Sequence, residues 1–244
     1  MSTPVLKPIS ARSALLSVLL GADESSLTAR EMVAAGSLLG IAETTVRAAL
    51  SRMASSGDLV REANGYALSA RLRRRQARQE EAVRPRTHET GGRWDMFVIT
   101  QSGRHAHERA ELRTSLTELR LAEVREGVWT RPANLDLTWP DAVAGTGEHF
   151  VSTPAGDPGQ LAARLWDLTG WAQRARQLLA AADTDDHVQR FTACASSVRH
   201  LLADPVLPAD LLPADWPGDE LRASHLRYRR WLIDLRRELS TESA

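Results

Sequence analysis

A helix predicted over residues 43–56 carries side chains that could read the bases of DNA. One face of this helix is apolar, with Val46, Leu50 and Met53 at helical spacing. The opposite face is small, hydrogen-bonding or cationic, and it comprises Thr44, Thr45, Arg47, Ala48, Ser51 and Arg52. Arg can bond N7 and O6 of guanine, and small side chains let a helix sit deep in the major groove. The pattern predicts a base-reading helix, in which Arg47 and Ser51 contact bases and Arg52 contacts a phosphate; an exposed helix of a structural bundle is the alternative.

The segments before this helix predict a helix-turn-helix order. Ser10 can cap a first helix that Gly21 ends, and Thr28 with Glu31 forms a capping box that begins a second helix. Gly40 then turns the chain into the third helix. Because DNA-binding proteins often use a helix, a tight turn and a second helix in this order, the third helix has the expected place for recognition.

A hairpin is predicted directly after the third helix. Leu59–Glu62 and Tyr66–Leu68 flank Asn64 and Gly65, a dipeptide that signals a hairpin turn because both residues tolerate positive φ. Three helices and a hairpin predict a winged helix-turn-helix DNA-binding domain over residues 1–70. Arg61 and Asn64 are the DNA contacts expected on the wing, with Arg61 on a phosphate.

The segment 71–92 is predicted to be an Arg-rich helical connector. Its densest run contains Arg71, Arg73, Arg74 and Arg75. Residues 1–92 hold 13 Lys and Arg against 9 Asp and Glu, whereas the whole chain has formal net charge zero. A basic run that follows a DNA-binding module can clamp phosphates without reading sequence. A solvated helix face is the alternative interpretation.

The remaining sequence predicts two further domains. A strand at Arg93–Ile99, a helix over about 106–119 and short strands at 121–124, 128–131 and 149–153 indicate a small α+β domain at 93–156. Three apolar stripes at helical spacing follow, so residues 157–244 are expected to form a helical C-terminal domain. The predicted fold class is α+β.

Four blocks of sequence resemble the PaaX-type regulators, which are named for the repressor of phenylacetic acid degradation. The blocks are Thr45–Met53 with Gly57 following, Gly127–Pro132, Leu165–Leu168 and Leu207–Gly218. They occur in the right order, and the resemblance covers nearly the whole chain. It implies a homodimeric transcriptional regulator of bacterial catabolic genes, with an N-terminal winged helix, a ferredoxin-like middle domain and a helical C-terminal domain.

The resemblance also implies a small-molecule effector, typically an aromatic acyl-CoA thioester that releases a repressor from DNA. Two places combine arginine with an aromatic surface and are the candidate effector contacts. They are Trp129 with Arg131, and Arg227 with Arg230. A partly buried salt bridge is the alternative for each of these arginines.

Two positions depart from the family pattern. Family members have Ser at the start of the recognition helix, where this chain has Ala42, and the missing cap should weaken the helix start by about 1 kcal/mol. After the first strand of the middle domain the family tends to have an acidic residue and then Pro, whereas this chain reads Thr100-Gln101-Ser102-Gly103. The missing acidic residue argues against a ferredoxin-like nuclease.

The sequence offers no catalytic or metal-binding pattern. The 244 residues include one cysteine, Cys194, which is expected to be a buried structural thiol. His105 and His107 lack further ligands at metal-binding spacing. No secretory signal or membrane-spanning run is recognised, so a cytoplasmic protein is expected. No enzyme activity, cofactor or metal is predicted.

Together these observations predict a cytoplasmic transcriptional repressor that binds a double-stranded DNA operator as a homodimer. A small-molecule effector, such as an aromatic acyl-CoA, is expected to release it. The alternative is an acyl-CoA-binding protein or a metabolic enzyme whose winged helix serves only assembly. A protein that processes nucleic acid through its middle domain is a third hypothesis, which the missing acidic residue disfavours.

Overall fold

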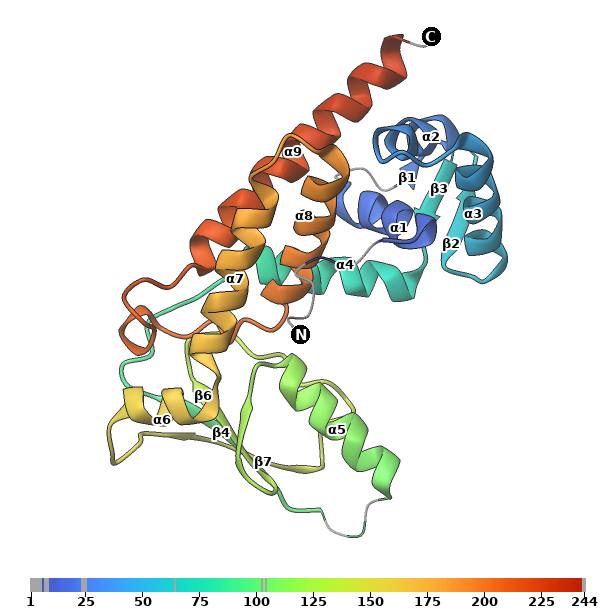
Figure 1. The fold of residues 1–244 in the computed structure, drawn as a ribbon. Coiled ribbons are helices and arrows are strands. Elements are labelled where there is room, and N and C mark those ends of the chain that lie inside the picture. Colours follow the sequence, from blue (N-terminus) through green and yellow to red (C-terminus); the bar gives the residue numbers. More distant parts are fainter. Residues whose placement is uncertain are drawn as a thin grey trace. The chain divides into compact units, whose positions relative to one another are not determined.

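The computed structural model shows an α+β protein (Figure 1). It describes Leu6 and residues 9–22, 26–63, 65–101, 103 and 105–242, with side chains described to residue 234. The chain divides into two compact units. Unit 1 consists of Met1–Arg84, Gln173–Leu202 and Pro217–Ala244, and unit 2 of Pro85–Ala172 and Ala203–Trp216. The predicted division into three domains and a connector stays a prediction, because one compact unit can hold more than one domain.

The N-terminal part of unit 1 contains three helices and a small antiparallel sheet. Its elements are α1 (Ala11–Gly21), β1 (Ser26–Leu27), α2 (Ala29–Leu38), α3 (Glu43–Ser55), β2 (Leu59–Glu62) and β3 (Gly65–Leu68). The strands are ordered β1-β3-β2. The predicted helices and hairpin are confirmed within one or two residues at their ends, whereas β1 is too short for a sequence pattern to reveal.

Local capping explains where the helices begin. The hydroxyl of Ser10 accepts a hydrogen bond from the backbone N–H of Ser13 at the start of α1. The backbone N–H of Glu31 donates to the Thr28 hydroxyl, and the Thr28 N–H donates to the Glu31 carboxylate, so the predicted capping box is present. At the start of α3, Ala42 provides no side-chain cap. This end of α3 therefore lacks the cap that the other two helices have.

Gly65 is required by a close approach of two strands. Leu27 of β1 pairs with Tyr66 of β3, and a Cβ at position 65 would lie only 2.3 Å from the carbonyl oxygen of Leu27. The sequence assigns Gly65 to the hairpin turn, where its backbone freedom is useful. In the structure its small size has a second purpose, because it makes room for β1.

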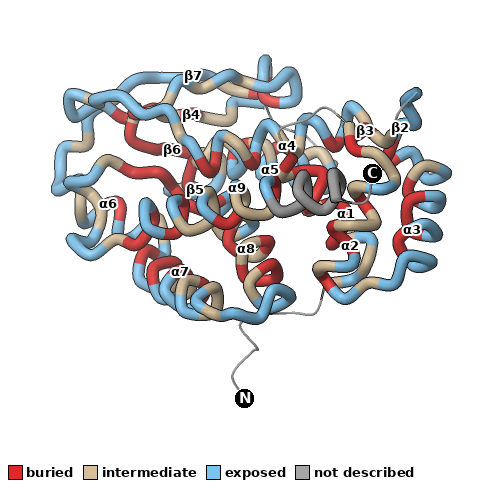
Figure 2. Tube along the Cα trace, turned by 90° about the horizontal axis from the view of Figure 1, so that it is seen from above, coloured by how far each residue is buried: buried red, intermediate tan, exposed pale blue. Residues whose placement is uncertain are grey.

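The core of unit 1 joins the N-terminal elements to the helix that follows them and to two helices from the C-terminal part of the chain. These helices are α4 (Ala70–Val83), α8 (His187–Leu201) and α9 (Gly218–Glu242). Leu15, Met32 and Leu50 belong to the same buried cluster as Phe191 of α8 and Tyr228 of α9. The three-helix part and the C-terminal helices thus share one hydrophobic core. The buried side of each helix faces this core, as Figure 2 shows for α1, α3 and α8.

Unit 2 is built on a four-stranded antiparallel sheet of order β5-β6-β4-β7. Its elements are β4 (Trp94–Ile99), α5 (Ala106–Glu118), β5 (Ala122–Arg125), β6 (Val128–Pro132), β7 (Gly147–Ser152), α6 (Pro158–Leu165) and a short 3-10 helix, Ala209–Leu211. Leu112 and Leu116 of α5 pack on Phe97 and Trp129 of the sheet. The apolar stripe predicted from residue 161 to residue 179 is divided between α6 and α7 (Leu168–Ala182).

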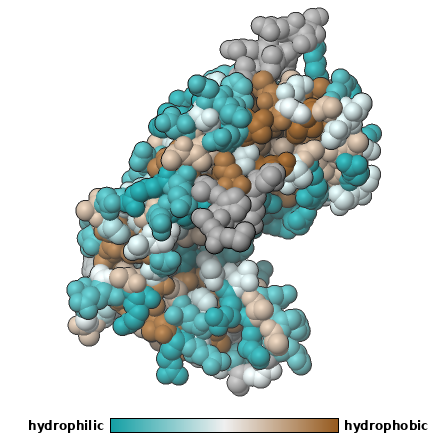
Figure 3. All heavy atoms as spheres, viewed as in Figure 1, coloured by the Kyte–Doolittle hydropathy of each residue, from teal (hydrophilic) through white to brown (hydrophobic). Residues whose placement is uncertain are grey.

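The surface of the described chain mixes polar and apolar residues. Hydrophilic residues cover most of the face seen in Figure 3, with hydrophobic residues visible between them. Large exposed hydrophobic side chains include Phe150 and Val151 of β7, which are 50% and 59% exposed. Within the described residues, no helix has the length and apolar composition needed to cross a membrane.

The uncapped start of α3 gives a first prediction. Replacing Ala42 with Ser should stabilise the protein by about 1 kcal/mol, because the new hydroxyl can accept a backbone N–H of the first helical turn. Ala42 is exposed and has backbone angles of −59° and 142°, which suit a capping residue. Urea unfolding measures the change. The reciprocal variant Ser10→Ala should lose a similar amount, and an Ala42→Ser protein that is less stable than the parent would contradict this account.

Candidate nucleic-acid interface

The outer face of α3 is open to solvent. The predicted contact residues on it are all exposed, namely Thr44, Thr45, Arg47, Ala48, Ser51 and Arg52. Val46, Leu50 and Met53 are buried on the opposite face and are at most 1% exposed. The buried and exposed faces determine how α3 is rotated about its own axis. The small and cationic side chains therefore form one continuous exposed surface.

Arg47 is already engaged on this surface. Its Nε donates to Glu43 Oε1 at 2.7 Å, an ion pair one helical turn apart in which both side chains are more than half exposed. An exposed pair of this kind contributes at most about 1 kcal/mol, so the Arg47 guanidinium can leave it for a stronger acceptor. Glu43 is the acidic residue that the sequence places at the start of the helix.

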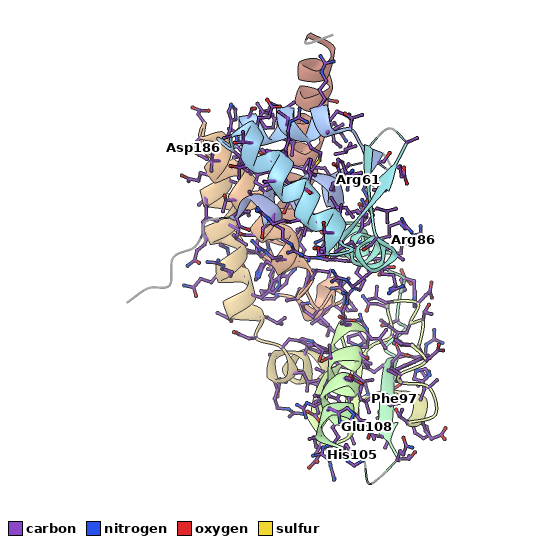
Figure 4. All side chains as sticks on the ribbon, turned by 90° about the vertical axis from the view of Figure 1, so that its right-hand side faces the viewer. Arg61, Arg86, Phe97, His105, Glu108 and Asp186 are labelled. Carbon is purple, nitrogen blue, oxygen red and sulfur yellow. The ribbon has the colours of Figure 1, made fainter. Side chains whose placement is uncertain are left out.

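The predicted wing lies beside this face. Arg61 is exposed on β2, with its guanidinium carbon 5.7 Å from the centre of the Tyr66 ring on β3 (Figure 4). Stacking on the ring holds the cation on the hairpin while leaving it accessible. Asn64, the other contact predicted on the wing, lies outside the described residues.

Asp58 is a charged residue that the sequence analysis did not single out. It follows α3, is 3% exposed, and accepts hydrogen bonds from Arg12 and from Nη2 of Arg71, the latter at 2.5 Å. The Ser56 hydroxyl donates to it as well, at 3.3 Å. The hydrogen bond from Arg12 is the main cause that lowers the pKa of Asp58. One buried carboxylate thus joins α1, the end of α3 and α4.

The arginines of the run in α4 point to different sides of the helix and differ in exposure. Arg71 is exposed but bonds to Asp58, and Nη1 of Arg73 donates to the carbonyl of Leu68 at 2.7 Å. Arg74 is exposed, whereas Arg75 is half-buried. The run is therefore not one solvated face. Arg73 and Arg74 remain the members best placed to reach a phosphate, and the contacts predicted for Arg71 and Arg75 stay predictions.

The candidate effector residues fall in two different units. Trp129 is buried in the core of unit 2, while Arg227 and Arg230 are exposed on α9 of unit 1. Arg131 is fully buried. Its guanidinium donates to the carbonyls of Leu119, Pro132 and Val206 and to the side-chain oxygen of Asn134.

These contacts explain the buried charge of Arg131. Burial lowers its pKa to about 9, which leaves the guanidinium charged at neutral pH. Its partner Val206 has a φ of +50°, a strained value for a β-branched residue that its surroundings must hold in place. Arg131 and Asn134 both bond the Val206 carbonyl. The arrangement gives Arg131 a structural role, and the effector contact expected for it stays a prediction.

The other chemistry-bearing groups have ordinary structural partners. The backbone N–H of His105 donates to the Glu108 carboxylate at the start of α5 (Figure 4). His149 lies 2.9 Å from the buried carboxylate of Asp95. Within the part of the chain that the structure describes, no group of three or more His, Cys, Asp and Glu side chains could hold a metal ion.

Comparison with family models identifies the chain. The model of the PaaX-like protein matches residues 10–72, that of the PaaX protein central Cas2-like domain matches residues 87–155, and that of the PaaX-like protein C-terminal domain matches residues 161–240. The chain belongs to the PaaX family, which confirms the resemblance. Family membership supports a PaaX-like regulator rather than an enzyme.

A solved structure supports the same grouping. It is an uncharacterized protein from Mycobacterium tuberculosis that is 47% identical to this chain. The match covers 94% of this chain and 98% of the other, with a TM-score of 0.83. A search of curated proteins found no match.

The buried carboxylate of Asp58 gives a second prediction. Its pKa is lowered in the folded protein, so its stabilising effect is complete above the pKa of an unfolded Asp and is lost as the pH falls through the folded pKa. Asp58→Asn should therefore reduce stability by about 1.5–3 kcal/mol at pH 7. The difference from the parent should shrink below about pH 4.

Denaturant unfolding at several pH values measures this effect. Glu43→Gln is the matched control, because it removes an acid from an exposed pair and should change stability by less than about 0.5 kcal/mol. A loss for Asp58→Asn that is equally large at pH 7 and pH 3 would show that the charge of Asp58 is not the cause.

Proposed function

We propose that this protein is a DNA-binding transcriptional repressor of catabolic genes that a small-molecule effector releases. The observation that carries the proposal is the exposed outer face of α3, which presents small and cationic side chains in a chain of the PaaX family. A surface of this kind suits the major groove, where arginine and small residues read bases.

The order of elements in residues 1–70 supports a winged helix-turn-helix. The segment α2, a turn at Gly40 with φ of +68°, and α3 have the order of a helix-turn-helix. The hairpin β2–β3 follows, and β1 completes a three-stranded sheet. In such domains the second helix of the motif enters the major groove. On this proposal α3 is the recognition helix and the hairpin is the wing.

The strand order of unit 2 supports a ferredoxin-like middle domain. Strands β4, β5, β6 and β7 lie in the order β5-β6-β4-β7, and α5 connects β4 to β5. A ferredoxin-like domain has this order with a helix in its second crossover. Here residues 133–146, which contain turns, make that connection. The domain division at 71–92, 93–156 and 157–244 is proposed on the same grounds.

The proposed regulator works as a homodimer in the cytoplasm. Two copies related by a twofold axis would place two α3 helices on two half-sites of a palindromic operator. An effector such as an aromatic acyl-CoA would weaken this binding through a difference in its affinity for free and DNA-bound protein. Footprinting on the DNA upstream of its own gene tests the function, and the absence of any protected sequence would argue against a repressor of its own gene.

Arg47 gives a third prediction. Arg47→Ala should reduce discrimination at one base pair per half-site by about 1–3 kcal/mol, since a guanidinium on a guanine edge is base-specific. Melting should be unchanged, because the residue is exposed and its pair with Glu43 is weak. Fluorescence anisotropy with operator variants gives the measurement. The control is Arg125→Ala, an exposed arginine on β5 of unit 2. An equal loss for every sequence would make Arg47 only a phosphate contact.

The exposed arginines of α4 give a fourth prediction. The double variant Arg73→Ala/Arg74→Ala should weaken binding equally for all sequences. The slope of log affinity against log salt should fall by about 0.9 for each phosphate that the variant no longer neutralises, counted over both protomers. Titrations at several salt concentrations measure the slope. An unchanged slope would leave these arginines as a solvated helix face.

A further inference from the structure

Unit 1 contains a partly open cavity that is lined by α1, α4, α8 and α9. Its volume is about 140 Å³. A cavity of about 150 Å³ in another protein accommodates a benzene ring, so this one can hold a ring or a short branched chain. About half of its wall is apolar and includes Leu16, Leu20, Val83, Phe191, Val198 and Leu232. The other half is polar or charged and lies on the same four helices.

Tyr228 of α9 lines this cavity and has an unsatisfied hydroxyl. The residue is 9% exposed, lines the cavity, and packs against Phe191 and Trp231 with ring centres 6.5 Å and 5.2 Å away. Its hydroxyl has no hydrogen-bond partner among the described residues. A buried polar group without a partner destabilises a protein by about 1–3 kcal/mol. An acceptor oxygen of a ligand would remove this penalty.

Arg75 of α4 brings an uncompensated cation to the same cavity. It is half-buried, and none of the described carboxylates forms an ion pair with it. Desolvation and then repulsion by neighbouring arginines lower its pKa. These neighbours are Arg199, Arg78, Arg12 and Arg71. Such a concentration of positive charge favours an anion, which arginine binds with charge-assisted hydrogen bonds.

The other ionisable groups on the cavity wall do not supply this missing negative charge. Glu80 is paired with Arg229 at 2.6 Å. Cys194 Sγ lies 3.1 Å from His225 Nδ1, and burial raises the pKa of the thiol to about 12 and lowers that of the imidazole to about 4. Both groups are therefore neutral at pH 7.

We propose that this cavity is the effector site of the protein and binds a compact apolar acid or its thioester. The apolar group occupies the cavity, a carbonyl or carboxylate oxygen accepts from Tyr228, and the negative charge pairs with Arg75. The proposal rests on the regulator function above and adds the place of the site and the chemical class of its ligand. A free acid supplies the charge as its carboxylate. A coenzyme A thioester would place only its acyl group in the cavity, because its phosphates lie at the far end of the pantetheine arm.

Arg12 connects this site to the DNA-reading surface. It lines the cavity from α1 and also bonds to Asp58, which follows α3. An anion beside Arg75 competes with Asp58 for the Arg12 guanidinium. Loss of that bond would leave Asp58 with Arg71 and Ser56 only, which loosens the attachment of the end of α3 to α1. The ligand thereby favours a state with lower DNA affinity.

Calorimetry on the full chain without DNA tests the site. The probes are phenylacetate, hexanoate, phenylacetyl-CoA, coenzyme A alone and the neutral phenylacetamide. We expect an acid or the thioester to bind, and Tyr228→Phe and Arg75→Met each to weaken it about 10- to 100-fold. Arg125→Met, an exposed arginine of unit 2, is the control and should bind normally.

Stability separates a binding role of Tyr228 from a structural one. Without ligand, Tyr228→Phe should be at least as stable as the parent, because it removes an unsatisfied hydroxyl. A destabilised Tyr228→Phe protein would overturn this role. So would binding by none of the probes, equal binding of phenylacetamide and phenylacetate, or affinities that neither variant changes. Binding of the acid alone would identify a carboxylate ligand, and binding of the thioester but not coenzyme A would identify an acyl-CoA.

Two further readouts separate the site from the proposed function. Hydrogen exchange of residues 53–62 should become faster when the probe binds, with no DNA present, and unchanged exchange would overturn the coupling through Arg12. Operator affinity should fall about 5- to 150-fold with the probe, the range of a typical coupling. A protein that binds the probe in this cavity but binds no DNA would support the site and contradict the repressor function.

Discussion

The buried carboxylate of Asp58 is the constraint on which the arrangement of the N-terminal helices and hairpin depends. It receives Arg12 from α1 and Arg71 from α4 at the point where α3 ends and the hairpin begins. A buried charge is tolerated only when it is paired and hydrogen-bonded, so the three elements must stay together for the carboxylate to remain charged. The position of α3 is therefore set both by apolar packing and by the ion pairs of Asp58 with Arg12 and Arg71. Another anion could compete with Asp58 for these arginines.

An excess of positive charge surrounds Arg75, near the ion pairs of Asp58. Arg75 has cations as its neighbours, whereas Arg12 and Arg71 share a single carboxylate. The N-terminal helices and the C-terminal helices share one hydrophobic core, in which Phe191 and Tyr228 pack with residues of α1, α2 and α3. A ligand held by the C-terminal helices would thus act within the same packed body that carries α3. No long pathway is needed to connect effector and operator.

Structural features that depend on residues close together in the sequence could be predicted. Ser10, Thr28 with Glu31, and the turn before Gly65 are local signals, and the helices and hairpin that they mark are present. The exposed face of α3 follows in the same way from helical spacing. Asp58, the orphan hydroxyl of Tyr228 and the half-buried position of Arg75 depend on packing between helices that lie far apart in the sequence. Arg131 illustrates the limit: its pairing with Trp129 in sequence suggests a binding surface, yet its partners include Asn134 and the distant Val206.

The central claim is that the outer face of α3 lies against DNA, and affinity cleavage tests it most directly. In a Ser55→Cys variant, an iron chelate can be attached to the new cysteine on this exposed face. The single native cysteine, Cys194, should not be labelled, because burial raises its pKa to about 12 and makes it a poor nucleophile. Glu126→Cys places the same chelate on an exposed residue of unit 2. The account predicts cleavage of operator DNA from position 55, centred on each half-site. Cleavage from position 126 and none from position 55 would contradict it.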